Sequence, residues 1–269
     1  MTGAGAARKP VSGSRSVAVP PAIVAFFDAL GDMAVLSRDT LRAIALRPPE
    51  WSAIAEQLEQ VGWRSLSIVN LTALSTGMVL ALQLGHSLER FGAKPFVSRI
   101  LGLSLVRELG PILTALMIGG RVGAGIAAEL GTMAVTEQVD AIRALGASPV
   151  RALVAPRMIA ILVMLPMLTV VSDLVGIAGG LIISLTELRV SADFYWNSLV
   201  QGLVVNDVIS GLGKSVFFAY FIGIIACRTG LRVTGGADGV GRATTATVVA
   251  ASITVLVSDF FLTKLFLVS

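Results

Sequence analysis

Five charged residues lie inside segments that are otherwise apolar, and they are the residues best suited to bind a charged ligand. They are two cations and three carboxylates: Arg107, Lys214, Glu108, Asp207 and Asp259. A charge in membrane hydrocarbon costs at least about 2.5 kcal/mol on insertion scales, so such residues usually face a partner or a wet cavity. The cations can attract an anionic group such as phosphate, and the carboxylates can keep such a site hydrated.

Three interpretations of these residues are open. Arg107 and Glu108 are adjacent in RELGPILTALMIGG, and neighbours on a helix do not face each other, so each is expected to engage another helix. The five residues can then line a cavity for an anionic ligand, or form a buried ion network that only fixes helix register. Alternatively, Glu108, Asp207 and Lys214 can carry protons, although the internal repeats common in secondary transporters are not found. Gly110-Pro111 would loosen the helix beside them, because proline removes a backbone hydrogen bond.

The composition indicates an all-α integral membrane protein. Of the 269 residues, 55% are hydrophobic and 14% are charged, whereas a soluble domain carries roughly a quarter charged residues. A helix needs about 20 apolar residues to cross a bilayer. Five transmembrane helices are therefore expected, in residues 63–86, 96–128, 150–185, 194–229 and 243–268.

The N-terminal part divides into two regions before the transmembrane domain, residues 48–269. Residues 1–21 are predicted to be a disordered basic N-terminus, and they do not read as a secretory signal. Residues 22–47 show apolar positions at helical spacing with charges opposite, which predicts an amphipathic helix lying in the membrane interface. The same pattern also suits a helix packed on the protein's own membrane domain.

Basic residues predict the orientation. Arg and Lys gather in the N-terminal region and in the second and fourth connections between spans, and such residues favour the cytoplasmic side. The N-terminus is therefore expected in the cytoplasm, and the C-terminus outside it.

A short helix is predicted between the second and third spans, in AAELGTMAVTEQVDAIRALGASP. Thr136 can cap it, Glu137 lies in its first turn, and Gly146 with Pro149 provides a stop. The helix either closes the connection or acts as a coupling helix that presses into a cytoplasmic partner.

The segment RELGPILTALMIGGRVGAGIAAELGTMAVTEQVDAIRALGASPVRALVAPR resembles the signature region of the MlaE/YrbE family, the permease subunits of MCE-type lipid-transport ABC systems. The likeness continues through GKSVFFAYFIGIIAC and GGADGVGRATTATVV, and so covers most of the chain from about residue 63 onward. The resemblance implies a homodimer in the bacterial inner membrane. It also implies a cytoplasmic ABC ATPase, often with a STAS-domain protein bound to it, and a periplasmic ring of MCE-domain proteins that exchanges phospholipid with the dimer.

The resemblance also assigns residues. It places Arg107, Glu108, Asp207, Lys214 and Asp259 in or near the lipid pocket. It places ATPase binding in residues 129–146, which include Glu129, Thr136, Glu137, Gln138, Asp140, Arg143 and Gly146. Separately, Leu74, Met78 and Leu82 recur at i, i+4 and i+8, so they can line a groove for acyl chains or face bulk lipid.

Several other classes are not indicated. No metal site, cofactor or nucleic-acid partner is expected, and the clustered acids or metal motif of a lipid-metabolising enzyme are not found. GADGVGRAT lacks the lysine and hydroxyl residue of a nucleotide-binding P-loop. Its glycines, with Gly235, predict a cytoplasmic turn, after which Thr244 or Thr245 helps to start the last helix.

Overall fold

The computed structural model describes residues 21–46 and 50–268, and every regular element within these ranges is a helix. The longer elements are α1 (Pro21–Leu46), α2 (Trp51–Val61), α3 (Leu66–Glu89), α8 (Ala155–Thr186), α9 (Ala192–Gly202), α10 (Val205–Leu231) and α11 (Gly236–Val268). The second span is built from α4 (Val97–Ser104), η3 (Leu105–Leu109), α5 (Gly110–Ile118), η4 (Gly119–Gly123) and α6 (Ala124–Val135), and the remaining elements are η1 (Trp63–Ser65), η2 (Lys94–Phe96), α7 (Gln138–Ala144) and η5 (Val150–Val154). The predicted disorder of residues 1–21 falls almost entirely outside the described residues.

Within the described residues, five helical segments are long and apolar enough to cross a membrane, which confirms the all-α integral membrane prediction. They are Trp51–Glu89, Lys94–Val135, Val150–Thr186, Val205–Leu231 and Gly236–Phe266. The first of these extends further toward the N-terminus than expected, because α2 leads into α3 through the short η1 turn.

The expected fourth span, 194–229, was wrong at its beginning. Leu203 and Val204 adopt extended backbone angles, so α9 ends at Gly202 and a separate helix, α10, starts at Val205. The Asp207 carboxylate accepts a hydrogen bond from the Val204 N–H at 3.0 Å, which caps the new helix. The membrane-crossing part therefore begins eleven residues later than the apolar pattern indicated.

The expected glycine turn before the last helix was also too long. Of the four glycines of this turn, Gly235 and Gly236 have positive φ angles, +87° and +69°, whereas Gly239 and Gly241 lie inside α11. The hydroxyls of Thr244 and Thr245 donate to the Gly241 carbonyl within this helix, so neither residue starts it.

Glycines bring α3 and α8 together in the most extensive helix–helix contact of the described chain. A Cβ atom on Gly77 would lie 1.9 Å from the carbonyl oxygen of Gly176, so the two backbones touch directly. Membrane helices use such small residues because dispersion contacts, not water exclusion, hold them together.

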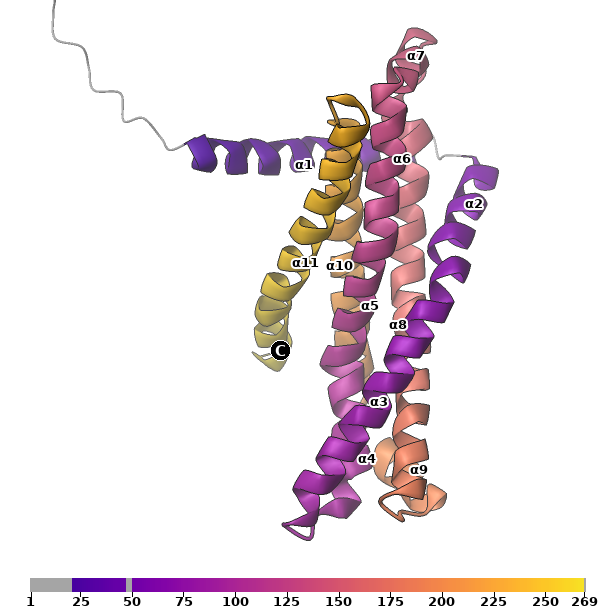
Figure 1. The fold of residues 1–269 in the computed structure, drawn as a ribbon, viewed down its shortest axis with the longest axis vertical. Coiled ribbons are helices and arrows are strands. Elements are labelled where there is room, and N and C mark those ends of the chain that lie inside the picture. Colours follow the sequence, from indigo (N-terminus) through magenta and orange to yellow (C-terminus); the bar gives the residue numbers. More distant parts are fainter. Residues whose placement is uncertain (1–20, 47–49, 269) are drawn as a thin grey trace, which may run out of the picture.

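The bundle is longer than a bilayer is thick. The segment Val150–Thr186 has 37 residues. At 1.5 Å per residue this is about 55 Å of helix, against about 30 Å of hydrocarbon. Figure 1 shows that α3, α4, α8 and α9 form one end of the molecule, well beyond the C-terminus of α11, whereas α7 forms the opposite tip.

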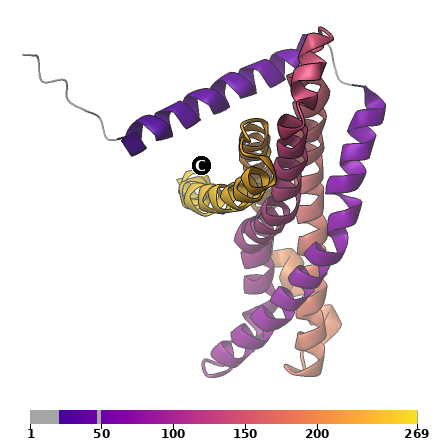
Figure 2. The ribbon, with the colours of Figure 1, turned by 45° about the horizontal axis from the view of Figure 1, so that its top comes forward.

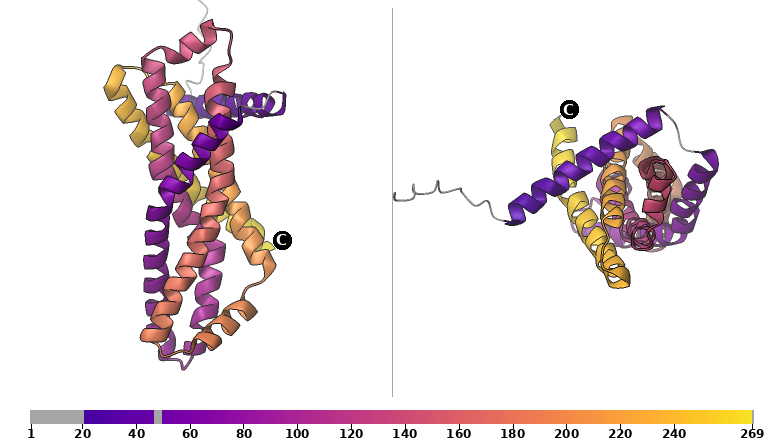
Figure 3. Two further views of the ribbon diagram at one scale, coloured as in Figure 1. Left: turned by 90° about the vertical axis from the view of Figure 1, so that its right-hand side faces the viewer. Right: turned by 90° about the horizontal axis from the view of Figure 1, so that it is seen from above.

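The first helix, α1, lies across the bundle near the α7 end and reaches out to one side of it (Figures 1 and 2). Viewed from above in Figure 3, it passes over α10 and α11. The charges of this helix were expected opposite its apolar side, but one of them, the Asp32 carboxylate, accepts from Arg228 at 2.9 Å and from Arg232 at 2.6 Å. Ser37 and Tyr220 share a further hydrogen bond, so α1 is fastened to α10.

A Gly77→Ala substitution tests the direct backbone contact. The new Cβ would meet the Gly176 carbonyl, which cannot move aside like a side chain, so we expect a loss of about 2 kcal/mol or more in unfolding free energy. Thermal unfolding of the purified protein in detergent measures this loss. Gly120→Ala is the matched control, because a Cβ there meets nothing within 4 Å. Equal melting temperatures for the two variants would contradict the close contact.

Candidate functional site

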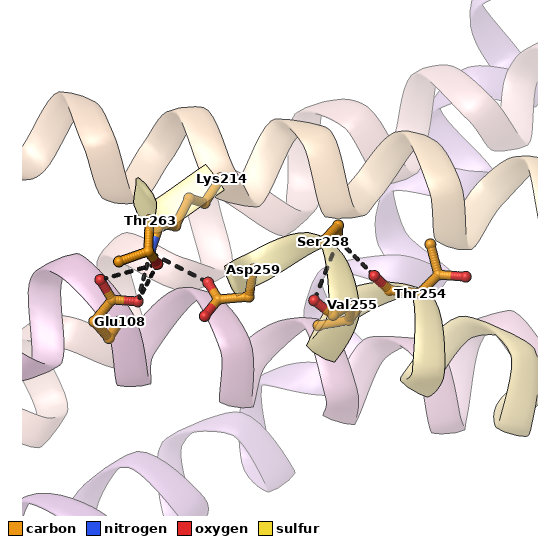
Figure 4. Close-up of polar contacts among 7 residues, drawn as sticks. All are labelled: Glu108, Lys214, Thr254, Val255, Ser258, Asp259 and Thr263. Atoms are coloured by element: carbon orange, nitrogen blue, oxygen red, sulfur yellow. Dashed lines mark hydrogen bonds and ion pairs between the residues drawn. The ribbon is translucent and has the colours of Figure 1, made fainter. Parts of the chain in front are cut away.

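The five charged residues singled out in the sequence do meet, in two neighbouring groups between η3, α10 and α11. In the first group Arg107 Nη1 lies 3.3 Å from Asp207 Oδ1. In the second, Lys214 Nζ donates to Glu108 Oε2 at 2.5 Å and lies 3.2 Å from Asp259 Oδ1. Figure 4 shows the second group, in which carboxylates from two helices approach one ammonium. We call these five residues the charged layer.

Lys214 is the centre of the layer. Its side chain is fully buried, and its ammonium also donates to Thr263 Oγ1 at 2.7 Å. The Thr263 hydroxyl in turn donates to Glu108 at 3.1 Å, so Thr263 belongs to the network, although the sequence analysis did not include it. Arg107 and Glu108 are the more open members, with side chains 23% and 33% exposed.

A local change of helix type directs Arg107 and Glu108 toward their partners. Both lie in η3, a single π-helical turn that is followed directly by Gly110 and Pro111. Proline has no N–H to donate to the preceding turn, so the sequence there favours a departure from regular α-helix, as predicted. Such π turns are frequent at functional sites.

The partners on α10 are placed by simple helical spacing. Asp207 and Lys214 are seven residues apart, about two turns, and therefore lie on one face of the helix. Asp207 also lies in the first turn of α10, where a carboxylate is favoured by the helix dipole. With two cations and three carboxylates, the layer carries one negative charge in excess when all five groups are ionised.

Asp173 is a further carboxylate within the spans. It packs against Gly110, where a Cβ atom would lie 1.7 Å from Asp173 Oδ1. That oxygen is buried and has no hydrogen-bond partner among the described residues. The glycine next to Pro111 thus makes room for a side chain of α8.

The predicted acyl-chain residues lie beside a groove, not in it. A groove of about 300 Å³ runs along α3 and is lined by Ser75, Thr76, Val79, Leu80, Gln83 and Leu109. Leu74 instead packs on Gly179 of α8, Met78 is half-buried, and Leu82 is 49% exposed. The groove contains three polar side chains, Ser75, Thr76 and Gln83, and Leu109 lines it from the side of η3.

The short helix α7 has seven residues, and its capping differs from the prediction. Thr136 ends α6, because its hydroxyl donates back to the Thr132 carbonyl at 2.8 Å. Glu137 precedes α7 with a left-handed φ of +60° and makes no side-chain cap, and Gln138 donates to Thr136 at 3.0 Å. The expected Thr136 cap was therefore wrong.

The end of α7 follows the prediction. Gly146 has a φ of +75°, and the N–H groups of Gly146 and Ala147 donate to the carbonyls of Arg143 and Ile142. This pattern is a Schellman motif, which suits glycine because other residues disfavour positive φ.

The charged residues of the predicted coupling segment separate into two places. Asp140 and Arg143 form an ion pair at 2.7 Å on α7, both about two-thirds exposed at the tip of the molecule. Glu129 lies on α6 and binds the buried Arg157 of α8 at 2.7 Å. The exposed pair contributes little stability and is free to meet a partner, whereas Glu129 joins two spans.

Replacing the central ammonium tests the charged layer. Lys214→Met leaves the Glu108 and Asp259 carboxylates without their counter-ion, so we expect a loss of about 3 kcal/mol or more in unfolding free energy. The triple variant Lys214→Met, Glu108→Gln, Asp259→Asn removes the unpaired charges and should regain most of the loss. Thermal unfolding in detergent compares the three proteins. Wild-type stability of the single variant would show that the layer carries no such ion pairing.

The comparisons with known proteins agree with this architecture. The model of the permease MlaE family matches residues 54–265, which include the charged layer and α7. A probable ABC transporter permease protein of Rickettsia typhi is 42% identical over 242 residues, covering 90% of this chain and 93% of that protein.

Two further relatives come from Synechocystis and Arabidopsis thaliana. A probable ABC transporter permease protein of Synechocystis is 45% identical over 78% of this chain and 80% of its own length. The chloroplastic protein TRIGALACTOSYLDIACYLGLYCEROL 1 of Arabidopsis thaliana is 37% identical over 80% of this chain and 62% of its own length. The chain therefore belongs to the MlaE permease family and is a membrane-embedded permease of the ABC transporter type.

Proposed function

We propose that the chain moves phospholipids between the bacterial inner membrane and a periplasmic MCE-domain protein, in a system that maintains outer-membrane lipid asymmetry. The observation that carries the proposal is the charged layer, which lies within apolar spans of a bundle that also has a groove on α3. A phospholipid needs both features, a polar place for its headgroup and an apolar surface for its chains. The name of the Arabidopsis relative refers to a diacylglycerol lipid, which supports a lipid substrate.

The members of the layer take different roles in this proposal. Arg107 and Glu108 keep exposed surface, so they are the groups that meet a headgroup: the guanidinium binds phosphate, and the carboxylate accepts from a headgroup amine or hydroxyl. Lys214, Asp207 and Asp259 hold these two in place. Leu74, Met78 and Leu82 flank the α3 groove and complete the apolar surface for acyl chains.

Energy for transport is assigned to a separate cytoplasmic ABC ATPase. The ATPase docks on α7 of the permease, where Gln138, Asp140 and Arg143 are exposed and Gly146 fixes the end of the helix. Thr136 and Glu137 set the angle between α6 and α7. Glu129, through Arg157, passes movement of this end to α8.

The assembly follows the family pattern. Two copies form a homodimer in the inner membrane, with the N-terminus in the cytoplasm, α1 in the membrane interface and the C-terminus in the periplasm. The MCE-domain ring lies at the end formed by α4 and α9, and a STAS-domain protein is bound through the ATPase.

A second candidate is a proton-coupled transporter of lipids or other hydrophobic solutes. The excess carboxylate of the charged layer favours it, because one of three neighbouring carboxylates can hold a proton. Transport by the reconstituted complex distinguishes the two: ATP drives the first, and a proton gradient without ATP drives the second.

The first experiment is affinity purification of the tagged chain in mild detergent, followed by mass spectrometry of what remains bound. We expect an ABC ATPase, an MCE-domain protein and phospholipid. Arg107→Gln should reduce the bound phospholipid with the proteins still attached, because a phosphate ligand is lost at the charged layer. Arg90→Gln, an exposed arginine near the end of α3, is the matched control. Disassembly of the complex by Arg107→Gln would instead support a purely structural ion network.

The coupling role of α7 has its own test. Asp140→Lys reverses a charge that is about two-thirds exposed, so we expect the ATPase to be lost from the purified complex without a change in melting temperature. Glu187→Lys, an exposed acidic residue at the opposite end, should keep the ATPase. Full retention of the ATPase by the Asp140 variant would contradict docking at α7.

A further inference from the structure

A second polar site lies nearer the α7 end of the bundle, where Arg121 is thirteen residues, or about 20 Å of helix, beyond Glu108 of the charged layer. A cleft of about 280 Å³ opens between α2 and α6 and is lined by Gln57, Gln60, Val61, Arg64, Arg121, Val122, Gly125, Ile126 and Glu129. It therefore presents two arginines and two amides to the same space. The roles proposed above for ATPase docking and lipid transport use none of these four side chains.

The charge of the cleft is positive. Glu129 is already paired with the buried Arg157, and neither Arg64 nor Arg121 forms an ion pair within the described residues. Both arginines are exposed. Arg121 Nη1 donates to Ser65 Oγ at 2.6 Å, and Ser65 is itself fully buried, so one edge of the guanidinium is fixed and its remaining N–H groups stay available.

The cleft lies within the membrane span, not beyond it. Arg121 is in the π turn η4, and the flanking Gly119 and Gly123 both pack against Ile222 of α10. Ile222 is less than two helical turns, or about 9 Å, from Arg228, which is bonded to α1. A positive group at this depth attracts the headgroups of the nearer leaflet, because arginine can extend its guanidinium toward the interface.

The surface of α3 that follows Arg64 is apolar. Ile68 and Leu71 lie one and two turns from Arg64 on the same helical face, and they are 42% and 67% exposed. Trp63, 73% exposed, precedes Arg64 at the position where aromatic side chains favour a membrane interface. The ligand must therefore be anionic at one end and apolar at the other.

We propose that the cleft between α2 and α6 binds the phosphate of a phospholipid from the leaflet at the α7 end. Arg64 and Arg121 contact the phosphate, Gln57 and Gln60 donate to the rest of the headgroup, and an acyl chain lies along Ile68 and Leu71. This site is distinct from the charged layer and does not depend on transport. A lipid bound there bridges the first and second spans just before the second continues into α7.

Native mass spectrometry of the purified full chain, titrated with phosphatidylglycerol, tests the site. The double variant Arg64→Gln, Arg121→Gln should weaken binding of one lipid per chain by about tenfold or more, because two charge-assisted contacts are lost. Arg42→Gln, an exposed arginine on α1, controls for general attraction to the membrane surface and should bind normally. Equal binding by the double variant and the wild type would overturn the proposal.

A steric variant tests the same cleft without changing its charge. A Cβ at Gly125 meets nothing within 4 Å, so Gly125→Leu should fold normally, fill the cleft and displace the lipid. Gly241→Leu on α11, with equally open space, is the matched control and should retain it. Melting temperatures confirm that both variants fold, and lipid retained in Gly125→Leu would count against the site.

Two further measurements identify the occupant. Millimolar inorganic phosphate should not displace the lipid; displacement would show a site for a soluble phosphate and overturn the lipid assignment. If the double variant no longer self-associates but binds lipid as the wild type does, the cleft is an interface between copies and the proposal is wrong. Arg107→Gln should keep the lipid of this cleft, so a failure of the proposed function at the charged layer is distinguished from a failure here.

Discussion

The burial of one ammonium group determines how three helices of this protein meet. Lys214 has no contact with the surroundings of the chain, and an unpaired charge in such a place would destabilise the fold strongly. Glu108, Asp259 and Thr263 must therefore approach it together, which fixes η3 and α11 against α10 in both rotation and height. The same constraint leaves Arg107 beside the first turn of α10, so one buried cation positions the whole charged layer.

Departures from regular α-helix recur where the chain presents a cation. In the part of the chain that the structure describes, the π turns are η3, η4 and η5, and they contain Arg107, Arg121 and Arg151, respectively. A π turn widens the helix by one residue and so rotates the following side chains relative to those before it. In a bundle held by close backbone contacts, this local change can redirect a charged side chain without moving the packed glycines. Both proposed phosphate sites have an arginine in a π turn, Arg107 in the charged layer and Arg121 in the cleft between α2 and α6.

The sequence predicted the contacts of the charged residues, because an unpaired charge inside an apolar span is costly and few arrangements of the helices avoid that cost. Five charges in apolar segments had to find one another, and they do. Thr263 could not be predicted, because threonines in these helices also bond to their own backbone, as Thr247 and Thr254 do. The break at Leu203 and Val204 follows Gly202, but that glycine is itself helical, and the Asp207 cap at the break is a local hydrogen bond that the apolar pattern does not reveal. Gly239 and Gly241 resembled a loop, yet they continue α11.

The unequal lengths of the helices have a consequence for how cargo would leave the bilayer. The ends formed by α3 with α4 and by α8 with α9 lie well beyond the end of α11, so the bundle extends further on one side than on the other (Figure 1). A molecule rising past the end of α11 would meet protein on one flank only. For the proposed lipid cargo, this one-sided surface would shield part of the molecule from water above the headgroups and would shorten the aqueous gap to a receiving protein.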